Sequence, residues 1–143
     1  MEKPVQEIIE VQEQTPTKGK SVLVIDDDAD LLELMQTILE MEGYDVFISL
    51  SGAAALSLLE KIAQPDLILL DMQMEDMTGP EFLLMLEKNR PDIIESVPVV
   101  FVTALEKVPA SKATGFIRKP FDNDTFLEAV HRFIEMDASS LLK

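Results

Sequence analysis

The sequence contains no cysteine among its 143 residues. This absence excludes a disulfide framework, a thiol nucleophile and a cysteine-based metal site, and it fits a reducing compartment. No apolar run approaches the ~18 residues that a membrane-spanning helix needs, and residues 1–20 lack the apolar core of a signal peptide. We therefore expect a soluble protein of the cytoplasm that has no membrane partner.

Basic residues are also scarce, since 12 Lys and Arg stand against 27 Asp and Glu and the formal net charge is −15. A field of this sign repels the phosphate groups of nucleic acids and of anionic lipids, so no direct contact with nucleic acid is expected. The acidic excess lies early in the chain, because residues 21–60 hold nine acids and no Lys or Arg. Most of the scattered glutamates are interpreted as solubilising surface residues.

One domain accounts for most of the chain. Hydrophobic residues make up 47% of the sequence, and a domain of roughly 120 residues buries about two-thirds of its surface on folding and needs no cross-links. Residues 1–20 are polar and interrupted by Pro4 and Pro16, and we interpret them as a flexible acidic and polar tail. The domain is predicted to span residues 21–136, and residues 137–143 are expected to fray.

From residue 21 onward, short apolar runs alternate with segments whose apolar residues recur at helical spacing. Uninterrupted apolar runs are typical of strands that are buried on both faces of a parallel sheet. The alternation predicts an α/β fold in which helices cover both faces of a five-stranded sheet, with a ligand beyond the carboxyl ends of the strands. The expected strands are 22–25, 44–48, 67–70, 97–102 and 116–117, and the expected helices lie between Asp28 and Gly43 and at 51–63, 80–89 and 122–136.

Polar side chains stand where the predicted strands end. The first strand ends in Asp26 and Asp27, the third in Asp71 and the fourth in Thr103, while the fifth leads into Lys119. A right-handed, doubly wound sheet places these ends at one edge. Three neighbouring carboxylates invite a cation such as Mg²⁺, and one of them can then act as a nucleophile toward a phosphoryl group held by the metal, the ammonium and the hydroxyl. Each residue alone has an ordinary interpretation as a cap or surface residue.

Four segments carry a family resemblance, in this order along the chain: VLVIDDD, LILLDMQMEDMTG, VVFVTA and GFIRKPF. With them the sequence resembles the receiver domain of two-component response regulators, of the chemotaxis-regulator kind, over about residues 21–136. The resemblance implies a flavodoxin-like sheet with strand order 2-1-3-4-5. It also implies a phosphorelay switch and not an enzyme, apart from phosphoryl transfer to its own acceptor and slow hydrolysis. The implied partners are a histidine kinase or a histidine phosphotransfer domain, a downstream effector protein and, as a candidate, a second copy of the chain.

The resemblance also implies a phosphoacceptor and a metal site. Asp71 would be the phosphoacceptor, and the cofactor would be Mg²⁺ or Mn²⁺. Asp26 and Asp27 would hold the metal together with Asp71 and the backbone carbonyl of Gln73.

Five further positions match residues of the family. Thr103 would bind the phosphoryl group and shift toward it, Lys119 would pair with its oxygens, and Ala104 would take part in binding it. Phe116 matches the aromatic switch position, although an ordinary core aromatic is an equal alternative. Gly79 matches the glycine that closes the loop after the acceptor. The peptide bond after Lys119 is a candidate cis bond.

The sequence departs from the family at two points, and a further side chain, Leu105, bears on the lifetime of the phosphoryl group. Glu75 stands where a proline is common, so we expect altered loop mobility. The segment between Thr103 and Lys119 is short and contains Pro109, so the fourth helix should be shortened or missing and the usual output face remodelled. Leu105 offers no hydrogen bond to an attacking water, which predicts slow self-dephosphorylation.

Alternatives to a stand-alone phosphoreceiver remain open. An interaction module that never turns over phosphate is favoured by Glu75 and the short fourth segment, but the complete set of site residues opposes it. A phosphohydrolase with an aspartyl-phosphate would need a second carboxylate two residues after the acceptor, where this chain has Gln73. His131, the only histidine, is interpreted as a surface residue of the last helix and not as a phosphoryl relay.

Overall fold

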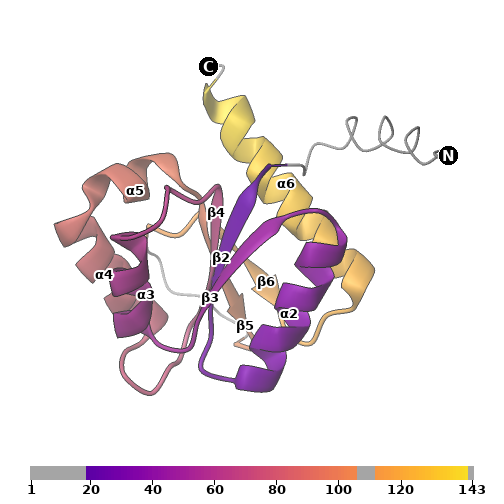
Figure 1. Ribbon diagram of the computed structural model, residues 1–143, viewed down its shortest axis with the longest axis horizontal. Coiled ribbons are helices and arrows are strands. Elements are labelled where there is room, and N and C mark those ends of the chain that lie inside the picture. Colours follow the sequence, from indigo (N-terminus) through magenta and orange to yellow (C-terminus); the bar gives the residue numbers. More distant parts are fainter. Residues whose placement is uncertain (1–18, 106–111, 142–143) are drawn as a thin grey trace, which may run out of the picture.

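The computed structural model describes residues 19–105 and 112–141. Five parallel strands form one sheet with helices on both faces (Figure 1). The sheet order is β3-β2-β4-β5-β6, which is 2-1-3-4-5 when the strands are counted from the first, so the expected fold class and order are confirmed. The strands are β2 (Ser21–Ile25), β3 (Asp45–Ser49), β4 (Leu67–Asp71), β5 (Val99–Thr103) and β6 (Gly115–Arg118).

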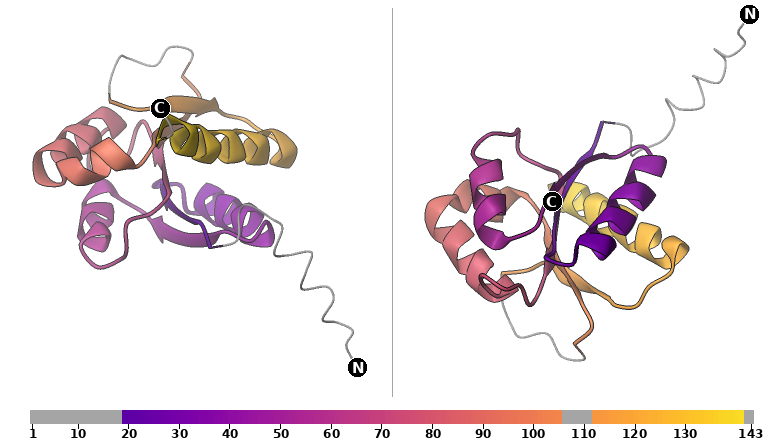
Figure 2. Two further views of the ribbon diagram at one scale, coloured as in Figure 1. Left: turned by 90° about the horizontal axis from the view of Figure 1, so that it is seen from above. Right: turned by 60° about the horizontal axis from the view of Figure 1, so that its bottom comes forward.

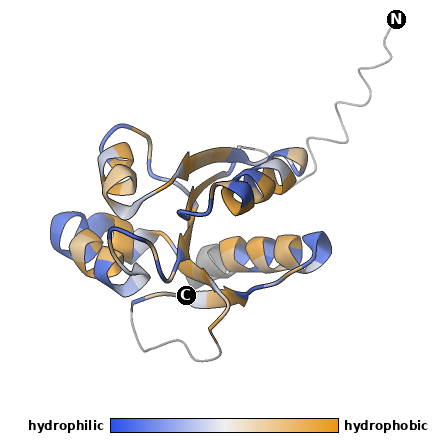
Figure 3. Cartoon of the chain, turned by 90° about the horizontal axis from the view of Figure 1, so that it is seen from below, coloured by the Kyte–Doolittle hydropathy of each residue, from blue (hydrophilic) through white to orange (hydrophobic). Residues whose placement is uncertain are grey.

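The helices form two layers, with α2 and α6 on one face of the sheet and α3, α4 and α5 on the other (Figure 2). The apolar strands run between these layers, while the outer faces of the helices are mostly hydrophilic (Figure 3). Among the helices of the described residues, none is long and apolar enough to cross a membrane. The helices are α2 (Ala29–Met41), α3 (Gly52–Leu59), α4 (Gly79–Asn89), α5 (Pro91–Ser96) and α6 (Asn123–Leu141).

The core is divided between the two faces because successive strand residues point in opposite directions. In the central strand β4, Leu69 packs into the cluster under α2 and α6, which also contains Phe126. Its neighbour Leu70 packs into the cluster under α3, α4 and α5, together with Phe82. All five residues of β4 are buried, which explains why its sequence is continuously apolar up to Asp71.

Local sequence signals determine several helix ends. The Asp28 side chain caps α2 by accepting hydrogen bonds from the N–H groups of residues 30 and 31, and Gly43 follows the helix with φ 101°. Both features agree with the sequence prediction. Helix α4 begins with a capping box formed by Thr78 and Glu81, with Pro80 in its first turn. These caps determine where the chain enters and leaves each helix.

Three helix predictions were wrong in detail. The six-residue helix α5 was not predicted, because fewer than two turns are too short to show apolar periodicity. Helix α3 ends at Leu59 and not at residue 63, and the chain continues there as turns. Helix α6 runs to Leu141, beyond the predicted end at Met136, so residues 137–141 are helical where fraying was expected.

Two predictions fall on residues outside the described part of the chain. Residues 1–18 of the predicted tail are not described, and neither are residues 106–111 of the predicted short fourth helical segment. The described residues on either side, 104–105 and 112–114, are not helical. The domain boundaries at 21 and 136, and the remodelled output face, stay predictions.

Candidate functional site

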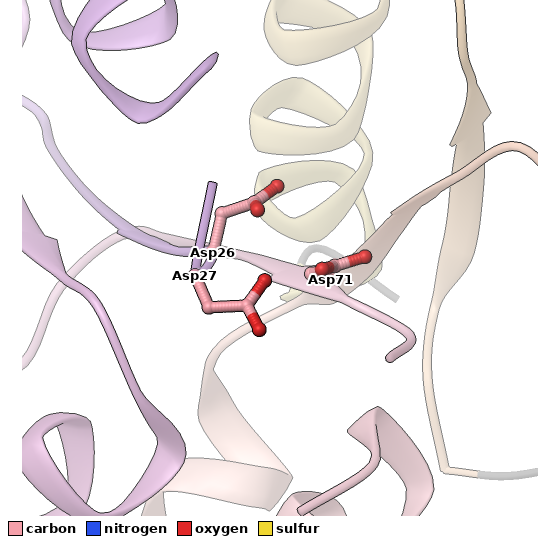
Figure 4. A group of neighbouring side chains, drawn as sticks. All are labelled: Asp26, Asp27 and Asp71. Atoms are coloured by element: carbon pink, nitrogen blue, oxygen red, sulfur yellow. The ribbon is translucent and has the colours of Figure 1, made fainter. Parts of the chain in front are cut away.

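Three carboxylates meet at the edge formed by the carboxyl ends of the strands. Asp26 and Asp27 follow β2, and Asp71 ends the adjacent strand β4 (Figure 4). The register pairs Ile25 with Leu70, so the residues that follow them also lie side by side. One carboxylate oxygen from each of the three aspartates lies within 4.8 Å of the others. The cluster expected from the strand ends is therefore present.

Asp26 is the most enclosed of the three, with 1% of its surface exposed. Its backbone N–H donates to the Ser49 carbonyl at 3.1 Å, and its Oδ1 accepts from the Asp28 N–H at 2.9 Å. The ammonium group of Lys119 lies 3.4 Å from Asp26 Oδ2 and 3.5 Å from Asp71 Oδ1. Lys119 therefore faces two carboxylates from neighbouring strands.

The surroundings of Asp71 raise the pKa of its carboxyl group above the usual range. Burial is the largest cause, and the negative charge of Asp26 adds to it. The Lys119 ammonium lowers the pKa, as does a long hydrogen bond of 3.5 Å from the Gln73 N–H. Because the net shift is upward, the charge of Lys119 does not fully offset burial and repulsion among the carboxylates. A bound cation would relieve this repulsion.

Thr103 and Lys119 reach the site from β5 and from the end of β6. The backbone N–H of Lys119 donates to the Thr103 carbonyl at 2.7 Å, and the peptide bond between Lys119 and Pro120 is cis, as expected. The buried Thr103 hydroxyl accepts a hydrogen bond from the Leu105 N–H at 3.0 Å. That bond uses the hydroxyl as an acceptor, so its own proton can still be donated into the site.

These residues surround one cavity of about 290 Å³. Its chemistry fits an oxygen-preferring divalent cation, because three carboxylates face it and Gln73 lines it. Lys119 and Thr103 add an ammonium and a hydroxyl, which suit an anionic group beside the cation. The lining residues are Asp26, Asp27, Asp28, Asp71, Met72, Gln73, Thr103, Ala104, Leu105 and Lys119.

Gly79 closes the connection between β4 and α4 at a very close approach. Its N–H donates to the Met72 carbonyl at 2.7 Å. A Cβ atom at this position would lie 2.7 Å from Phe101 Cε1 and 2.8 Å from the Asp71 carbonyl oxygen. The Phe101 ring and the backbone at the end of β4 leave no room for a side chain, so the glycine here is a steric requirement.

The structure excludes one of the two interpretations of Phe116 and modifies the interpretation of His131. Phe116 is not a core aromatic, since 43% of its surface is exposed and the Arg118 guanidinium carbon lies 5.3 Å from the centre of its ring. His131 is half-buried and not a plain surface residue, because its Nδ1 lies 2.8 Å from the Tyr44 hydroxyl and its Nε2 lies 3.5 Å from Glu42 Oε2. The switch role of Phe116 stays a prediction.

Two contacts of the β4–α4 loop were not predicted from the sequence. The Glu75 N–H donates to Asp27 Oδ2 at 2.9 Å, and the Asp76 carboxylate accepts from the N–H groups of Gly52 and Ala53. Both contacts join residues more than twenty positions apart, so no local pattern in the sequence indicates them.

Comparison with known proteins identifies related chains. A family model described as "Response regulator receiver domain" matches residues 22–131. Sporulation initiation phosphotransferase F of Bacillus subtilis is 32% identical over 127 residues, which cover 85% of this chain and 98% of the relative. Transcriptional regulatory protein GlrR of Escherichia coli is also 32% identical, but the match covers 85% of this chain and only 28% of that longer relative.

Solved structures give the same result for the fold. A CheY-like response regulator receiver domain protein from Methanospirillum hungatei superimposes with a TM-score of 0.74 at 28% identity, covering 85% of this chain and 98% of the other. The chemotaxis response regulator CheY4 of Vibrio cholerae gives a TM-score of 0.72 at 28% identity, covering 80% and 98%. The expected kind of fold and the expected family are therefore both confirmed.

Proposed function

The chain belongs to the response regulator receiver domain family, and from this membership we propose that Asp71 accepts a phosphoryl group. The observation that supports this assignment is the cavity at the sheet edge, where Asp71 lies beside Asp26 and 3.5 Å from Lys119 Nζ. An Asp71 carboxylate oxygen bonds to phosphorus as the phosphorus–nitrogen bond of a phosphohistidine donor breaks and the leaving imidazole takes a proton. The product is an acyl phosphate on this chain.

Asp26 and Asp27, with Asp71 and the backbone carbonyl of Gln73, would hold Mg²⁺ or Mn²⁺. The cation supplies positive charge that offsets the repulsion among the carboxylates and the charge of the phosphoryl oxygens. Support comes from the oxygen atoms of the three aspartates, which already lie within 4.8 Å of one another.

Three further residues complete the binding of the phosphoryl group. Lys119 pairs its ammonium with the phosphoryl oxygens, and Thr103 donates its hydroxyl proton to one of them. Ala104, which lines the same cavity, is assigned to the same group. Phosphoryl transfer depends mainly on positioning and charge stabilisation, and these side chains supply both without a separate acid or base.

Signalling would follow from a shift between two pre-existing conformations. The phosphoryl group draws Thr103 toward it, and the half-exposed ring of Phe116 is the side chain assigned to respond. The phosphate donor would be a histidine kinase or a histidine phosphotransfer domain in the cytoplasm, and the output a downstream effector protein or a second copy of the chain. The name of the Bacillus subtilis relative, a sporulation initiation phosphotransferase, supports a place in phosphoryl relay.

A labelling experiment tests this function. The full chain is incubated with a small acyl phosphate donor and with Mg²⁺ or a chelator, and intact-protein mass spectrometry counts the phosphoryl groups. We expect one group on the wild type with Mg²⁺, none with the chelator and none on Asp71→Ala. The matched control is Asp45→Ala, which removes an exposed aspartate on β3 and should leave labelling unchanged. Labelled Asp71→Ala would overturn the acceptor assignment.

Labelling, together with assays of Mg²⁺ binding and of phosphate ester hydrolysis, separates the alternatives. A wild-type chain that binds Mg²⁺ but never takes a phosphoryl group would support the interaction module that keeps the fold without the chemistry. Turnover of a small phosphate ester would support the phosphohydrolase. Gln73 argues against this alternative, because an amide cannot act as the second acid or base.

A further inference from the structure

The loop between β4 and α4, residues 72–78, is attached to the start of α3 by a carboxylate. Asp76 Oδ1 accepts from the Gly52 N–H at 3.2 Å, and Asp76 Oδ2 accepts from the Ala53 N–H at 2.9 Å. The local cap Ser51 accepts from the Ala54 N–H at 3.0 Å. The first N–H groups of α3 are therefore shared between a cap from the same helix and an aspartate from this loop, and a negative charge at a helix N-terminus is favourable.

An apolar contact reinforces this attachment. A Cβ atom on Gly52 would lie 2.6 Å from the Sδ atom of Met77, so the Met77 side chain lies directly over the glycine. Asp76 and Met77 are consecutive in the loop, and both contact the first turn of α3. Figure 1 shows the connection between β4 and α4 passing beside the lower end of α3.

The residue before Asp76 carries the loop's contact with the candidate metal site. The Glu75 N–H donates to Asp27 Oδ2 at 2.9 Å, across 48 positions of sequence. A proline at this position would have no N–H to donate. Glu75 therefore supplies a hydrogen bond to a carboxylate assigned to the cation.

The loop is short enough to couple these contacts. It is closed by hydrogen bonds from Gly79 N–H to the Met72 carbonyl at 2.7 Å and from Met74 N–H to the Met77 carbonyl at 3.2 Å. Glu75 and Asp76 are adjacent within this closed turn, so the anchor on α3 also determines where the Glu75 N–H points. Asp27 is exposed, so its side chain would be free to rotate without the hydrogen bond from the Glu75 N–H. Its carboxylate would then lose more conformational freedom on binding a cation.

We propose that Asp76 is a positioning residue for the cation site, because it anchors the loop on α3 and so directs the Glu75 N–H at Asp27. Asp76 itself does not touch the cation. The inference rests on the proposed function, which assigns Asp27 to the metal. Loss of a residue that orients a metal ligand commonly weakens metal binding by 10- to 100-fold, and because Asp76 acts through one intervening hydrogen bond, a smaller loss of about 3- to 10-fold in Mg²⁺ affinity is expected.

Mg²⁺ titration of the unphosphorylated full chain by calorimetry tests this inference. Asp76→Ala should weaken Mg²⁺ binding. Asp76→Asn should restore part of the affinity, because its single carbonyl oxygen can still accept from one of the two α3 N–H groups that Asp76 binds. The matched control is Ser51→Ala, which removes the other cap of the same helix without touching the loop. It should lower the stability of α3 while leaving Mg²⁺ affinity unchanged.

A second measurement needs no metal. Amide hydrogen exchange of metal-free protein, followed by NMR, should show faster exchange at Glu75 in Asp76→Ala than in Ser51→Ala. Equal Mg²⁺ affinity in Asp76→Ala and wild type, or equal loss in Asp76→Ala and Ser51→Ala, would overturn this inference alone. A wild-type chain that binds no Mg²⁺ would overturn the proposed function and this inference with it.

Discussion

The Lys119 ammonium lies 3.5 Å from Asp71 Oδ1 and also 3.4 Å from Asp26 Oδ2, with 22% of the Lys119 side chain exposed. Its positive charge therefore lies against two carboxylates of the candidate site. Lys119→Met should slow phosphorylation by an acyl phosphate donor by about 100-fold, the effect of losing one charge-stabilising donor. The rate of labelling by the donor, compared between Lys119→Met and wild type, measures this effect. Lys112→Met, which removes an exposed lysine paired with Glu87, is the control, and equal rates in both variants would contradict the role.

Asp71 should destabilise the metal-free protein at neutral pH. Its pKa is raised, chiefly by burial and then by Asp26, so the folded state binds the proton more readily than the unfolded state. The contribution of this group to folding stability is fully present below the pKa that Asp71 has in the unfolded state. It is lost as the pH rises through the pKa of Asp71 in the folded state. Asp71→Asn should therefore melt higher than wild type at pH 7 in a chelator, by about 4 °C for each kcal/mol relieved.

Mg²⁺ should reverse the sign of this comparison, because binding at the proposed site would stabilise the wild-type carboxylate cluster. Thermal unfolding of both proteins with and without Mg²⁺ checks the prediction. A lower melting temperature for Asp71→Asn in the chelator would show that the carboxylate is not under electrostatic strain.

Gly79→Ala should destabilise the fold by about 1–3 kcal/mol, the usual effect of overpacking. The new methyl group would meet the Asp71 carbonyl oxygen at 2.8 Å, and backbone in the central strand cannot move aside. Gly52→Ala is the matched control, because the three heavy atoms nearest to its new methyl group all belong to the flexible side chain of Met77. Chemical denaturation measures both, and a larger loss in Gly52→Ala would contradict the steric argument.

Leu105→Glu should speed decay of the acyl phosphate. Leu105 lines the cavity and is 38% exposed, so a carboxylate there could accept a proton from the attacking water. The expected acceleration is about tenfold, below the full effect of a well-placed general base. Release of inorganic phosphate from purified phosphoprotein measures the decay. Leu105→Met, which adds no proton acceptor, should decay like wild type.

Tyr44→Phe should lower the free energy of unfolding by about 1 kcal/mol, the usual net value of one hydrogen bond. The Tyr44 hydroxyl is 2.8 Å from His131 Nδ1, and this pair joins the segment after α2 to α6. Burial, then Glu42 and Glu135, raise the pKa of Tyr44 above its usual range, so the hydroxyl keeps its proton. Double-mutant analysis with His131→Gln should show non-additive losses; strict additivity would contradict the pairing.

Much of the fold and the site could be predicted because the signals are local. The apolar runs end at Asp26 and Asp71, and a parallel sheet brings such ends to one edge whatever the loops do. The cap at Asp28 and the glycine at residue 43 are likewise read from a few neighbouring residues. The order of the motifs indicated the family before any contact was known. Helix α5 was not predicted because six residues, fewer than two turns, show too little periodicity.

The sequence by itself determined the strand ends, the acidic cluster and the kind of fold, since these depend on burial patterns that repeat along the chain. Only the tertiary structure decided that the Glu75 N–H meets Asp27, that Asp76 caps α3 and that His131 pairs with Tyr44. The physical reason is that a hydrogen bond between distant residues depends on where packed elements leave their loops. The packing of the whole core brings donor and acceptor to within a few tenths of an ångström of hydrogen-bonding distance. No short stretch of sequence indicates such a contact.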